Sequence, residues 1–242
     1  MRLDVYLVKN GMLRSRTLAK EYIEHGSVSV NGNVANKPSL DVSEGDSVAV
    51  TAPLPRYVSR GGEKLQAAIE RFMIDVRGKV CCDIGASTGG FTDCLLRHGA
   101  ERVFAIDSGT AQLDPIIAEN PRVISIEGFN ARELTPDITS GLCDVAVVDV
   151  SFISQTLIIP AALSVLKNGG EYVGLIKPQF ECGRSGLGKG GIVRSQTVRD
   201  EAVRLVSDFG SKRGLEIRGV LTSPLTGGDG NTEYLMYGVK IR

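Results

Sequence analysis

The sequence contains no tryptophan and only two histidines, His25 and His98. Neither histidine adjoins any of the motifs described below, so a histidine-based acid–base mechanism is not expected. The five cysteines include no C-x-x-C pair. We interpret them as small buried side chains of a protein from a reducing compartment, rather than as disulfides or zinc ligands. No metal site is therefore expected.

The chain also lacks an excess of charge of either sign, because 28 Lys and Arg balance 28 Asp and Glu. Net charge therefore gives no indication of a nucleic-acid or membrane partner. The longest apolar run, LIIPAALSVL, is far shorter than the ~18 residues that suggest a membrane-spanning helix. Asp4 and Lys9 interrupt the N-terminal segment, which has no apolar core of a signal peptide. We expect a cytoplasmic location and no membrane partner.

What the sequence does contain is enough apolar residues for two domains of unequal size. The N-terminal part predicts a small α+β domain, with helices within 4–13 and 15–26 and a hairpin turn at Asn31-Gly32. Two prolines then predict an extended connection. The predicted parts are a small domain at 1–52, a linker at 53–61 and a large domain at 62–242.

The helical part of the small domain carries four cations and no anion between residues 5 and 20: Lys9, Arg14, Arg16 and Lys20. They are either a solvated helix face or contacts to a phosphate backbone. The run R-S-R-x-x-A-x-x-x-I-x-x-G-x-V-x-V-N-G resembles an S4 domain, a small RNA-binding module. This resemblance implies that the four cations help the chain dock on structured RNA.

From residue 79 onward, strand-like and helix-like segments alternate. Apolar strands alternating with helices predict a mostly parallel sheet covered on both faces, a Rossmann-like α/β fold. The expected strands are 79–84, 102–107, 122–126, 143–150, 171–177, 215–224 and 232–241. The expected helices are 90–99, one near 111–119, 154–170 and 195–214.

The first of these strands ends in DIGASTGGF, at the edge of the sheet where ligands of such folds bind. A dinucleotide cradle needs G-x-G-x-x-G, and this loop lacks the middle glycine. Its D-x-G-x-x-x-G-G pattern resembles motif I of class I methyltransferases, which bind S-adenosylmethionine (SAM). The cofactor-binding residues that this resemblance implies are Asp83, Gly85, Ser87, Thr88, Gly89, Gly90 and Phe91.

Three more residues extend the predicted cofactor site. Asp107 ends the second strand, where a carboxylate can accept both ribose hydroxyls or cap a helix. Phe129 and Asn130 lie beyond the third strand, near the expected position of the adenine.

Four ionisable residues should meet at the carboxyl edge of the sheet. Asp149 and Lys177 end the fourth and fifth strands, Glu233 begins the last strand, and Lys64 lies on the helix that enters the domain, in RYVSRGGEKL. This Lys–Asp–Lys–Glu order resembles the catalytic tetrad of FtsJ-like ribose 2′-O-methyltransferases. With the S4-like part, the whole chain resembles the TlyA, or hemolysin A, family. The family implies a cytidine ribose of ribosomal RNA as acceptor, in the large subunit and for some members also in the small subunit.

The predicted chemistry requires mainly that an oxygen be aligned with the activated methyl group of SAM. Two neighbouring lysines disfavour each other's charged form, so one of them can be neutral and act as a base. We assign this role to Lys177, with Asp149 and Glu233 orienting the ammonium groups. Lys64 would hold the ribose or an adjacent phosphate.

A glycine-rich insertion, CGRSGLGKGGIVRS at 182–195, is interpreted either as a lid over substrate RNA or as a surface loop. Arg60, Arg184 and Lys189 complete the predicted RNA contacts. Two other functions remain open. A nicotinamide-dependent oxidoreductase is disfavoured by the missing glycine. A non-catalytic protein that binds RNA or lyses membranes is the second alternative, and of its two forms direct lysis is disfavoured by the absence of a spanning or strongly amphipathic basic helix.

Overall fold

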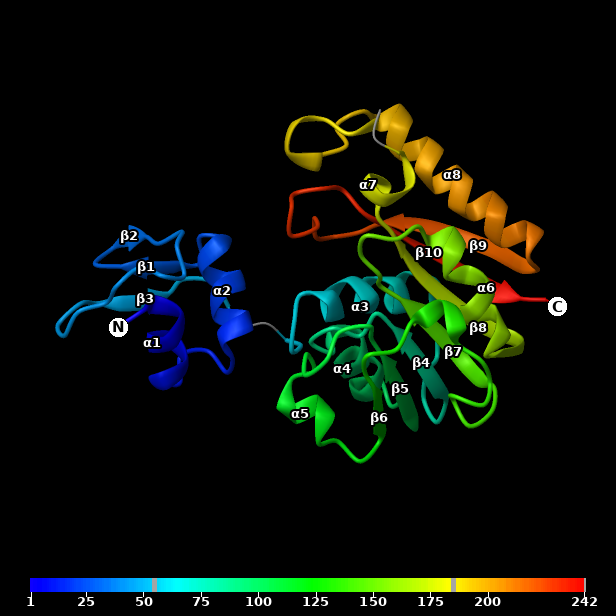
Figure 1. Ribbon diagram of the computed structural model, residues 1–242, viewed down its shortest axis with the longest axis horizontal. Helices are drawn as coiled ribbons and strands as arrows, with labels where there is room; N and C mark the ends of the chain where they lie inside the picture. Colours follow the sequence, from blue (N-terminus) through cyan, green and yellow to red (C-terminus); the bar gives the residue numbers. More distant parts are fainter. Residues whose placement is uncertain (54–55, 184–185, 242) are drawn as a thin grey trace. The chain divides into compact units, whose positions relative to one another are not determined.

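The computed structural model describes residues 1–53, 56–183 and 186–241, and the chain forms two compact units, Met1–Ser59 and Arg60–Arg242 (Figure 1). The boundary between the units falls inside the segment that the sequence assigns to the linker. Within the described residues, no helix has both the length and the apolar character needed to cross a membrane.

The first unit packs two helices against a small antiparallel sheet of strand order β2-β1-β3. Its elements are α1 (Leu3–Lys9), α2 (Arg16–Glu24), β1 (Val28–Val30), β2 (Asn33–Val34) and β3 (Val48–Val50). Ser15 caps α2 as predicted, because its hydroxyl accepts a hydrogen bond from the backbone N–H of Leu18 at 3.2 Å. Asn31 and Gly32 both adopt positive φ, as a tight hairpin turn requires.

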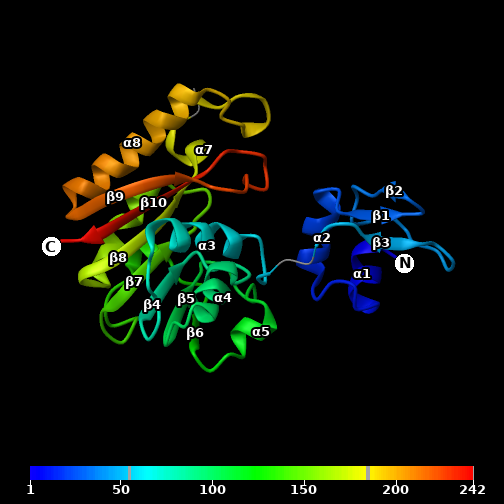
Figure 2. The same ribbon diagram turned by 180° about the vertical axis from the view of Figure 1, so that it is seen from behind.

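The second unit is built on a seven-stranded sheet of order β6-β5-β4-β7-β8-β10-β9 (Figures 1 and 2). Its strands are β4 (Val80–Ile84), β5 (Arg102–Ile106), β6 (Val123–Ile126), β7 (Cys143–Val148), β8 (Leu166–Ile176), β9 (Leu215–Thr222) and β10 (Tyr234–Lys240). Its α-helices are α3 (Gly61–Phe72), α4 (Gly90–Arg97), α5 (Pro115–Ala118), α6 (Ile159–Ser164), α7 (Pro178–Glu181) and α8 (Gln196–Lys212). Strands β4 to β8 pair in parallel, whereas β10 runs antiparallel between β8 and β9. The predicted Rossmann-like α/β fold is therefore confirmed.

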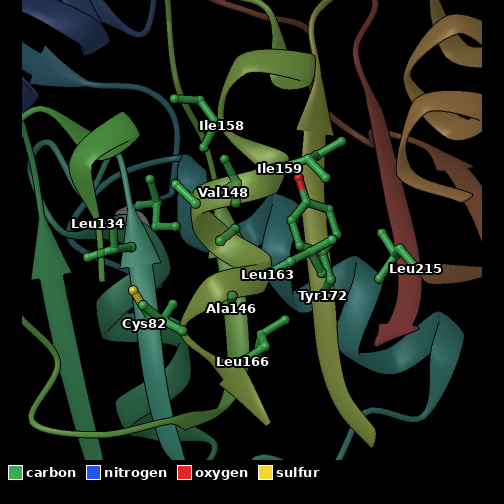
Figure 3. Close-up of a cluster of buried hydrophobic side chains, with 14 of the residues drawn as sticks. Cys82, Leu134, Ala146, Val148, Ile158, Ile159, Leu163, Leu166, Tyr172 and Leu215 are labelled. Carbon is green, nitrogen blue, oxygen red and sulfur yellow. The ribbon is translucent and has the colours of Figure 1, made fainter. Parts of the chain in front are cut away.

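Helices cover both faces of this sheet. Side chains of α6 and α8 share one hydrophobic cluster with the strands, while α3 and α4 pack against each other and against β10 and β4. Figure 3 shows Ile159 and Leu163 of α6 beside Tyr172 of β8. The hydroxyl of Tyr172 is buried, but it donates a 2.6 Å hydrogen bond to Gln155. This polar group therefore has a partner inside the core.

The predicted helix at 154–170 is wrong in extent, because α6 ends at Ser164 and the residues after it belong to β8. Leu166 is buried and pairs with Cys143 of β7, so tertiary packing takes this segment into the sheet. Lys240 of β10 donates 2.8 Å hydrogen bonds to the carbonyls of Leu163 and Leu166. These bonds pair carbonyl groups at the observed end of α6 and the start of β8. The sequence had placed the end of this helix further on, at the two glycines.

Candidate active site

A pocket of about 350 Å³ lies at the carboxyl ends of β4, β5 and β7. Gly85 follows the first of these strands, Asp107 the second and Asp149 the third, and all three line the pocket. This is the edge where ligands of open parallel sheets bind. Of the ten predicted cofactor residues, five line the pocket: Gly85, Ser87, Asp107, Phe129 and Asn130.

Asp107 connects the glycine-containing loop to the turn after β5. Its carboxylate accepts hydrogen bonds from the backbone N–H of Ser87 at 2.8 Å and of Gly109 at 2.7 Å. It therefore caps a turn and not a helix, which was the alternative considered from the sequence. Each carboxylate oxygen still has a lone pair, so the group can accept hydroxyl hydrogen bonds from a ribose.

Gly85 lies in a position that no other residue can occupy without movement. Its φ is +86°, and a Cβ atom there would lie 2.3 Å from the backbone oxygen of Asp149. The absence of a side chain lets the loop after β4 touch the loop after β7. The two sides of the pocket are thereby joined at one backbone contact.

The other five predicted cofactor residues lie outside the pocket lining: Asp83, Thr88, Gly89, Gly90 and Phe91. Asp83 is fully buried, and Thr92 donates a 2.6 Å hydrogen bond to its Oδ2 atom, while its Oδ1 atom has no partner. Burial raises the pKa of Asp83 to about 7. A direct cofactor contact of these five residues stays a prediction.

The four predicted catalytic residues form two ion pairs. The amine of Lys64 lies 2.5 Å from a carboxylate oxygen of Glu233, and the amine of Lys177 lies 2.7 Å from Asp149. Both lysine side chains are nearly buried, 10% and 12% exposed. The strand register explains why the two ion pairs lie side by side. Tyr234 of β10 pairs with Ile176 of β8, and this places Glu233 opposite Lys177.

The two pairs act on each other electrostatically. Burial raises the pKa of Glu233, while the positive charges of Lys64 and Lys177 oppose this rise and the negative charge of Asp149 adds to it. The four side chains are therefore one charged cluster, as the sequence predicts. Whether each of them has the assigned catalytic role stays a prediction.

A second pocket, of about 430 Å³, contains Lys177 and Glu233 and shares Ser151 and Phe152 with the first pocket. Its other wall comes from α7, from the glycine-rich insertion and from the loop before β10: Gln179, Phe180, Leu187, Gly191, Gly228 and Asp229. The charged cluster thus lies between a pocket that suits a cofactor and one that is open to an acceptor.

Sequence reasoning missed the two residues that separate the pockets. The hydroxyl of Ser151 accepts a 2.8 Å hydrogen bond from Lys177. Phe152 is 91% exposed, with a φ of +63°, and its ring lies 5.2 Å from that of Phe180. The motif DVSF directly after β7 is the only signal for them, since a positive φ at phenylalanine is not readable from a sequence.

The predicted RNA contacts have different surroundings. Arg14 donates a hydrogen bond to the carbonyl of Tyr57, and Arg16 forms a 2.9 Å ion pair with the buried carboxylate of Asp4. Lys9, Lys20 and Lys189 are exposed. Arg60 donates to the carbonyl of Thr226 at 3.2 Å, and Arg184 lies outside the described residues.

Within the part of the chain that the structure describes, no group of three or more His, Cys, Asp or Glu side chains is arranged to hold a metal ion. The five cysteines are free, and four of them are buried. Their burial agrees with the interpretation of the cysteines as small core side chains.

Comparison with known proteins gives two family matches. Residues 57–240 match the FtsJ-like methyltransferase family, and residues 1–48 match the S4 domain. Both resemblances noted in the sequence are therefore confirmed.

Relatives of similar length support the same assignment. The chain is 42% identical to the 16S/23S rRNA (cytidine-2′-O)-methyltransferase TlyA of Mycobacterium tuberculosis, with 98% of this chain and 88% of the relative covered. It is 43% identical to hemolysin A of Brachyspira hyodysenteriae, with 98% and 99% covered. A solved structure from Streptococcus thermophilus, provisionally called a hemolysin, is 41% identical in sequence and superposes with a TM-score of 0.80. The match covers 99% of this chain and 88% of the Streptococcus thermophilus chain. The chain belongs to the FtsJ-like methyltransferase family and carries an S4 domain at its N-terminal end.

Proposed function

We propose that this protein transfers the methyl group of SAM to the 2′-hydroxyl of a cytidine ribose in ribosomal RNA. The observation that carries the proposal is the charged cluster of two lysine–carboxylate pairs between the two pockets. The family match favours methyl transfer over the nicotinamide-dependent and the non-catalytic alternatives. The rRNA (cytidine-2′-O)-methyltransferase relative supports the acceptor.

The residues around the first pocket fit SAM. The Asp107 carboxylate can accept the ribose hydroxyls, and the bare backbone at Gly85 leaves room that a Cβ atom would fill. Phe129 offers an apolar wall for the adenine. When bound, SAM supplies a methyl group already activated by its sulfonium sulfur. The enzyme's own residues then need mainly to orient the acceptor and move one proton.

In this proposal the neutral form of Lys177 removes the proton of the 2′-hydroxyl at its Nζ atom. Asp149, 2.7 Å away, and the Ser151 hydroxyl, 2.8 Å away, hold that nitrogen in place. Lys64 is held by Glu233 and orients the ribose or a neighbouring phosphate by its charge. Lys177 can act as the base only as a neutral amine, because the lone pair of its Nζ atom accepts the proton.

The proposed partner is ribosomal RNA within a ribosomal subunit, bound in part through the S4 domain. Because the Mycobacterium tuberculosis relative is named for both 16S and 23S rRNA, we propose the large subunit as substrate and the small subunit as a second one. The proposed RNA-binding residues are Lys9, Arg14, Arg16, Lys20, Arg60, Arg184 and Lys189. A cytoplasmic location follows from this substrate.

Two measurements test the proposal. Isolated large and small ribosomal subunits are incubated with the protein and methyl-labelled SAM, and methylated riboses are mapped on both RNAs. Label at a cytidine 2′-oxygen is expected, whereas label on a base or no label at all contradicts the proposal. Calorimetry with SAM and with NAD separately tests the cofactor, and binding of NAD without SAM would reject it.

A further inference from the structure

A single buried asparagine ties together the segments that wall the second pocket. Asn231 is only 1% exposed. Its Oδ1 atom accepts a 2.8 Å hydrogen bond from the backbone N–H of Val193, and its Nδ2 atom donates to the carbonyl of Gly191 at 3.1 Å. One amide thus joins the glycine-rich insertion to the loop that leads into Glu233, two residues further on.

Asp229 extends this connection to a third segment. Its Oδ2 atom accepts from Nδ2 of Asn231 at 2.9 Å and from the side chain of Gln179 at 3.3 Å, and its Oδ1 atom accepts from the backbone of Asn231 at 3.1 Å. Gln179 lies on α7, two residues after Lys177. Figure 1 shows α7, the insertion after it and the loop before β10 at the same end of the second unit.

The turn that carries Asn231 also packs against the carboxylate of Glu233. The backbone N–H of Gly227 donates a 2.9 Å hydrogen bond to the carbonyl of Asn231. A Cβ atom at Gly227 would lie 2.6 Å from Oε1 of Glu233, so the two groups are in close contact. A shift of this turn would therefore displace the carboxylate that holds Lys64.

We infer that Asn231 is a positioning residue for methyl transfer. Its amide fastens the insertion to the turn that packs against Glu233, so the wall of the acceptor pocket and the Lys64–Glu233 pair are set together. The inference rests on the proposed function, because it assigns the second pocket to the acceptor. It also means that the insertion is held in place before RNA arrives, at least from Gly191 to Val193.

The first test compares Asn231→Ala with a matched control. The control is Thr139→Ala, because Thr139 is also buried, donates a 2.7 Å hydrogen bond to a backbone carbonyl, and lies in the turn before β7 at the opposite edge of the sheet. Single-turnover methylation of ribosomal subunits should fall about 100-fold for Asn231→Ala, the cost of misplacing reacting groups by about 1 Å. The affinity for SAM, measured by calorimetry, should stay within about twofold. Thr139→Ala should lower the melting temperature and leave the methylation rate unchanged.

The second test separates positioning from general stability. Asn231→Asp sets a second carboxylate beside Asp229 and removes the donor, so it should be as slow as Asn231→Ala. Adding Asp229→Asn restores a donor between the two side chains, although not the bond to Gly191, and it removes the oxygen that accepts from Gln179. The double variant should recover at least about tenfold in rate over Asn231→Asp, because one of the two lost hydrogen bonds is restored.

The outcomes are distinguishable. A wild-type enzyme that methylates riboses, with an Asn231→Ala variant that is less stable but equally fast, overturns the inference alone. The same holds if the double variant is no faster than Asn231→Asp. A wild-type enzyme without ribose methylation instead rejects the proposed function.

Discussion

Both edges of the large sheet carry lysine–carboxylate pairs, but the pairs differ in burial. At the carboxyl edge, Lys64–Glu233 has 10% and 3% of its side chains exposed. At the amino edge, Lys167–Asp144 has 50% and 27% exposed. The interatomic distances, 2.5 and 2.6 Å, are almost the same. Distance alone therefore does not distinguish a buried pair from a partly exposed one.

The carboxylates of the two edges respond differently to their surroundings. Burial raises the pKa of Glu233 despite two nearby lysines. Burial also acts on Asp144, but hydrogen bonds from Lys167 and from the backbone of Val80 outweigh it and lower the pKa of that carboxyl. A buried, incompletely compensated pair beside two pockets is the pattern expected of functional residues, whereas the partly exposed and well-compensated Lys167–Asp144 pair is expected to be structural.

The largest effect is expected at Lys177. Lys177→Ala should slow methyl transfer by about 10³-fold or more, because a positioned base contributes on this scale. Lys177→Arg should fail as well, since a guanidinium stays protonated and cannot accept the proton. Single-turnover methylation measures both, and circular dichroism and calorimetry with SAM check fold and cofactor binding. A Lys177→Arg variant near wild-type rate would exclude proton abstraction by this residue.

Lys64→Ala should be severe but less complete, with a loss of about 100-fold, because we assign it a positioning charge that solvent cations or the substrate can partly replace. The loss should be mainly in the methylation rate and not in SAM affinity. Lys64→Arg retains the charge and serves as the matched control, and it should be the milder of the two. Equal losses for both variants would argue against a simple charge role.

At Asp83 the effect of burial on a carboxylate of the carboxyl edge can be measured without a paired lysine. Its folded-state pKa of about 7 lies above the ordinary pKa of an aspartate side chain, so its protonated form favours folding at low pH and this stability is lost as the pH rises through 7. Wild-type stability should therefore fall by roughly 2 kcal/mol between pH 5 and pH 7 through this one group. Asp83→Asn should remove that slope in urea titrations. An unchanged slope would show that Asp83 is already ionised at pH 5.

The S4 unit offers a third arrangement, in which a fully buried carboxylate, Asp4, holds two exposed arginines. Hydrogen bonds from Arg2 and Arg16 outweigh burial and lower the pKa of Asp4 to about 2. Replacing Arg16 would confuse stability with RNA binding, so exposed Lys9 and Lys20 are the better probes. Lys9→Gln with Lys20→Gln should weaken RNA binding several-fold and flatten its salt slope by about one unit per lost phosphate contact. An unchanged slope would leave both lysines as solvated surface.

The smallest effect is expected at the amino edge. Lys79 lies 2.5 Å from Glu171, which also accepts a 2.8 Å hydrogen bond from Tyr237. Because the lysine side chain is 31% exposed and Glu171 keeps a second partner, Lys79→Met should cost at most about 1 kcal/mol of stability. Its methylation rate should equal that of the wild type. A large rate loss would break the distinction between the two edges.

The sequence predicted the gathering of the tetrad because Asp149 and Lys177 end parallel strands, Glu233 begins the last strand, and Lys64 lies on the helix that enters the domain. It could not predict the pairing. Lys64 and Glu233 are 169 residues apart, and their contact depends on the register of β10 and on the rotation of α3. Neither quantity is encoded in local periodicity.

Errors in the predicted elements and site have similar causes. The end of α6 was misplaced because Leu166 gains more from pairing with β7 than from continuing a helix. Phe152 was missed because an exposed aromatic residue with positive φ follows from the packing of its loop. Asn231 was missed because its partners, Gly191 and Val193, are joined to it only in the folded chain.

The place of β10 has a consequence for how the enzyme is made. This strand is inserted between β8 and β9, both of which are synthesised before it, and Glu233 directly precedes it. Chains emerge from the ribosome N-terminal end first, at about 5–20 residues per second. Lys64 therefore has no carboxylate partner while the 168 residues between it and Glu233 are translated. The Lys64–Glu233 pair can therefore form only after β10, the last strand of the sheet, has been made.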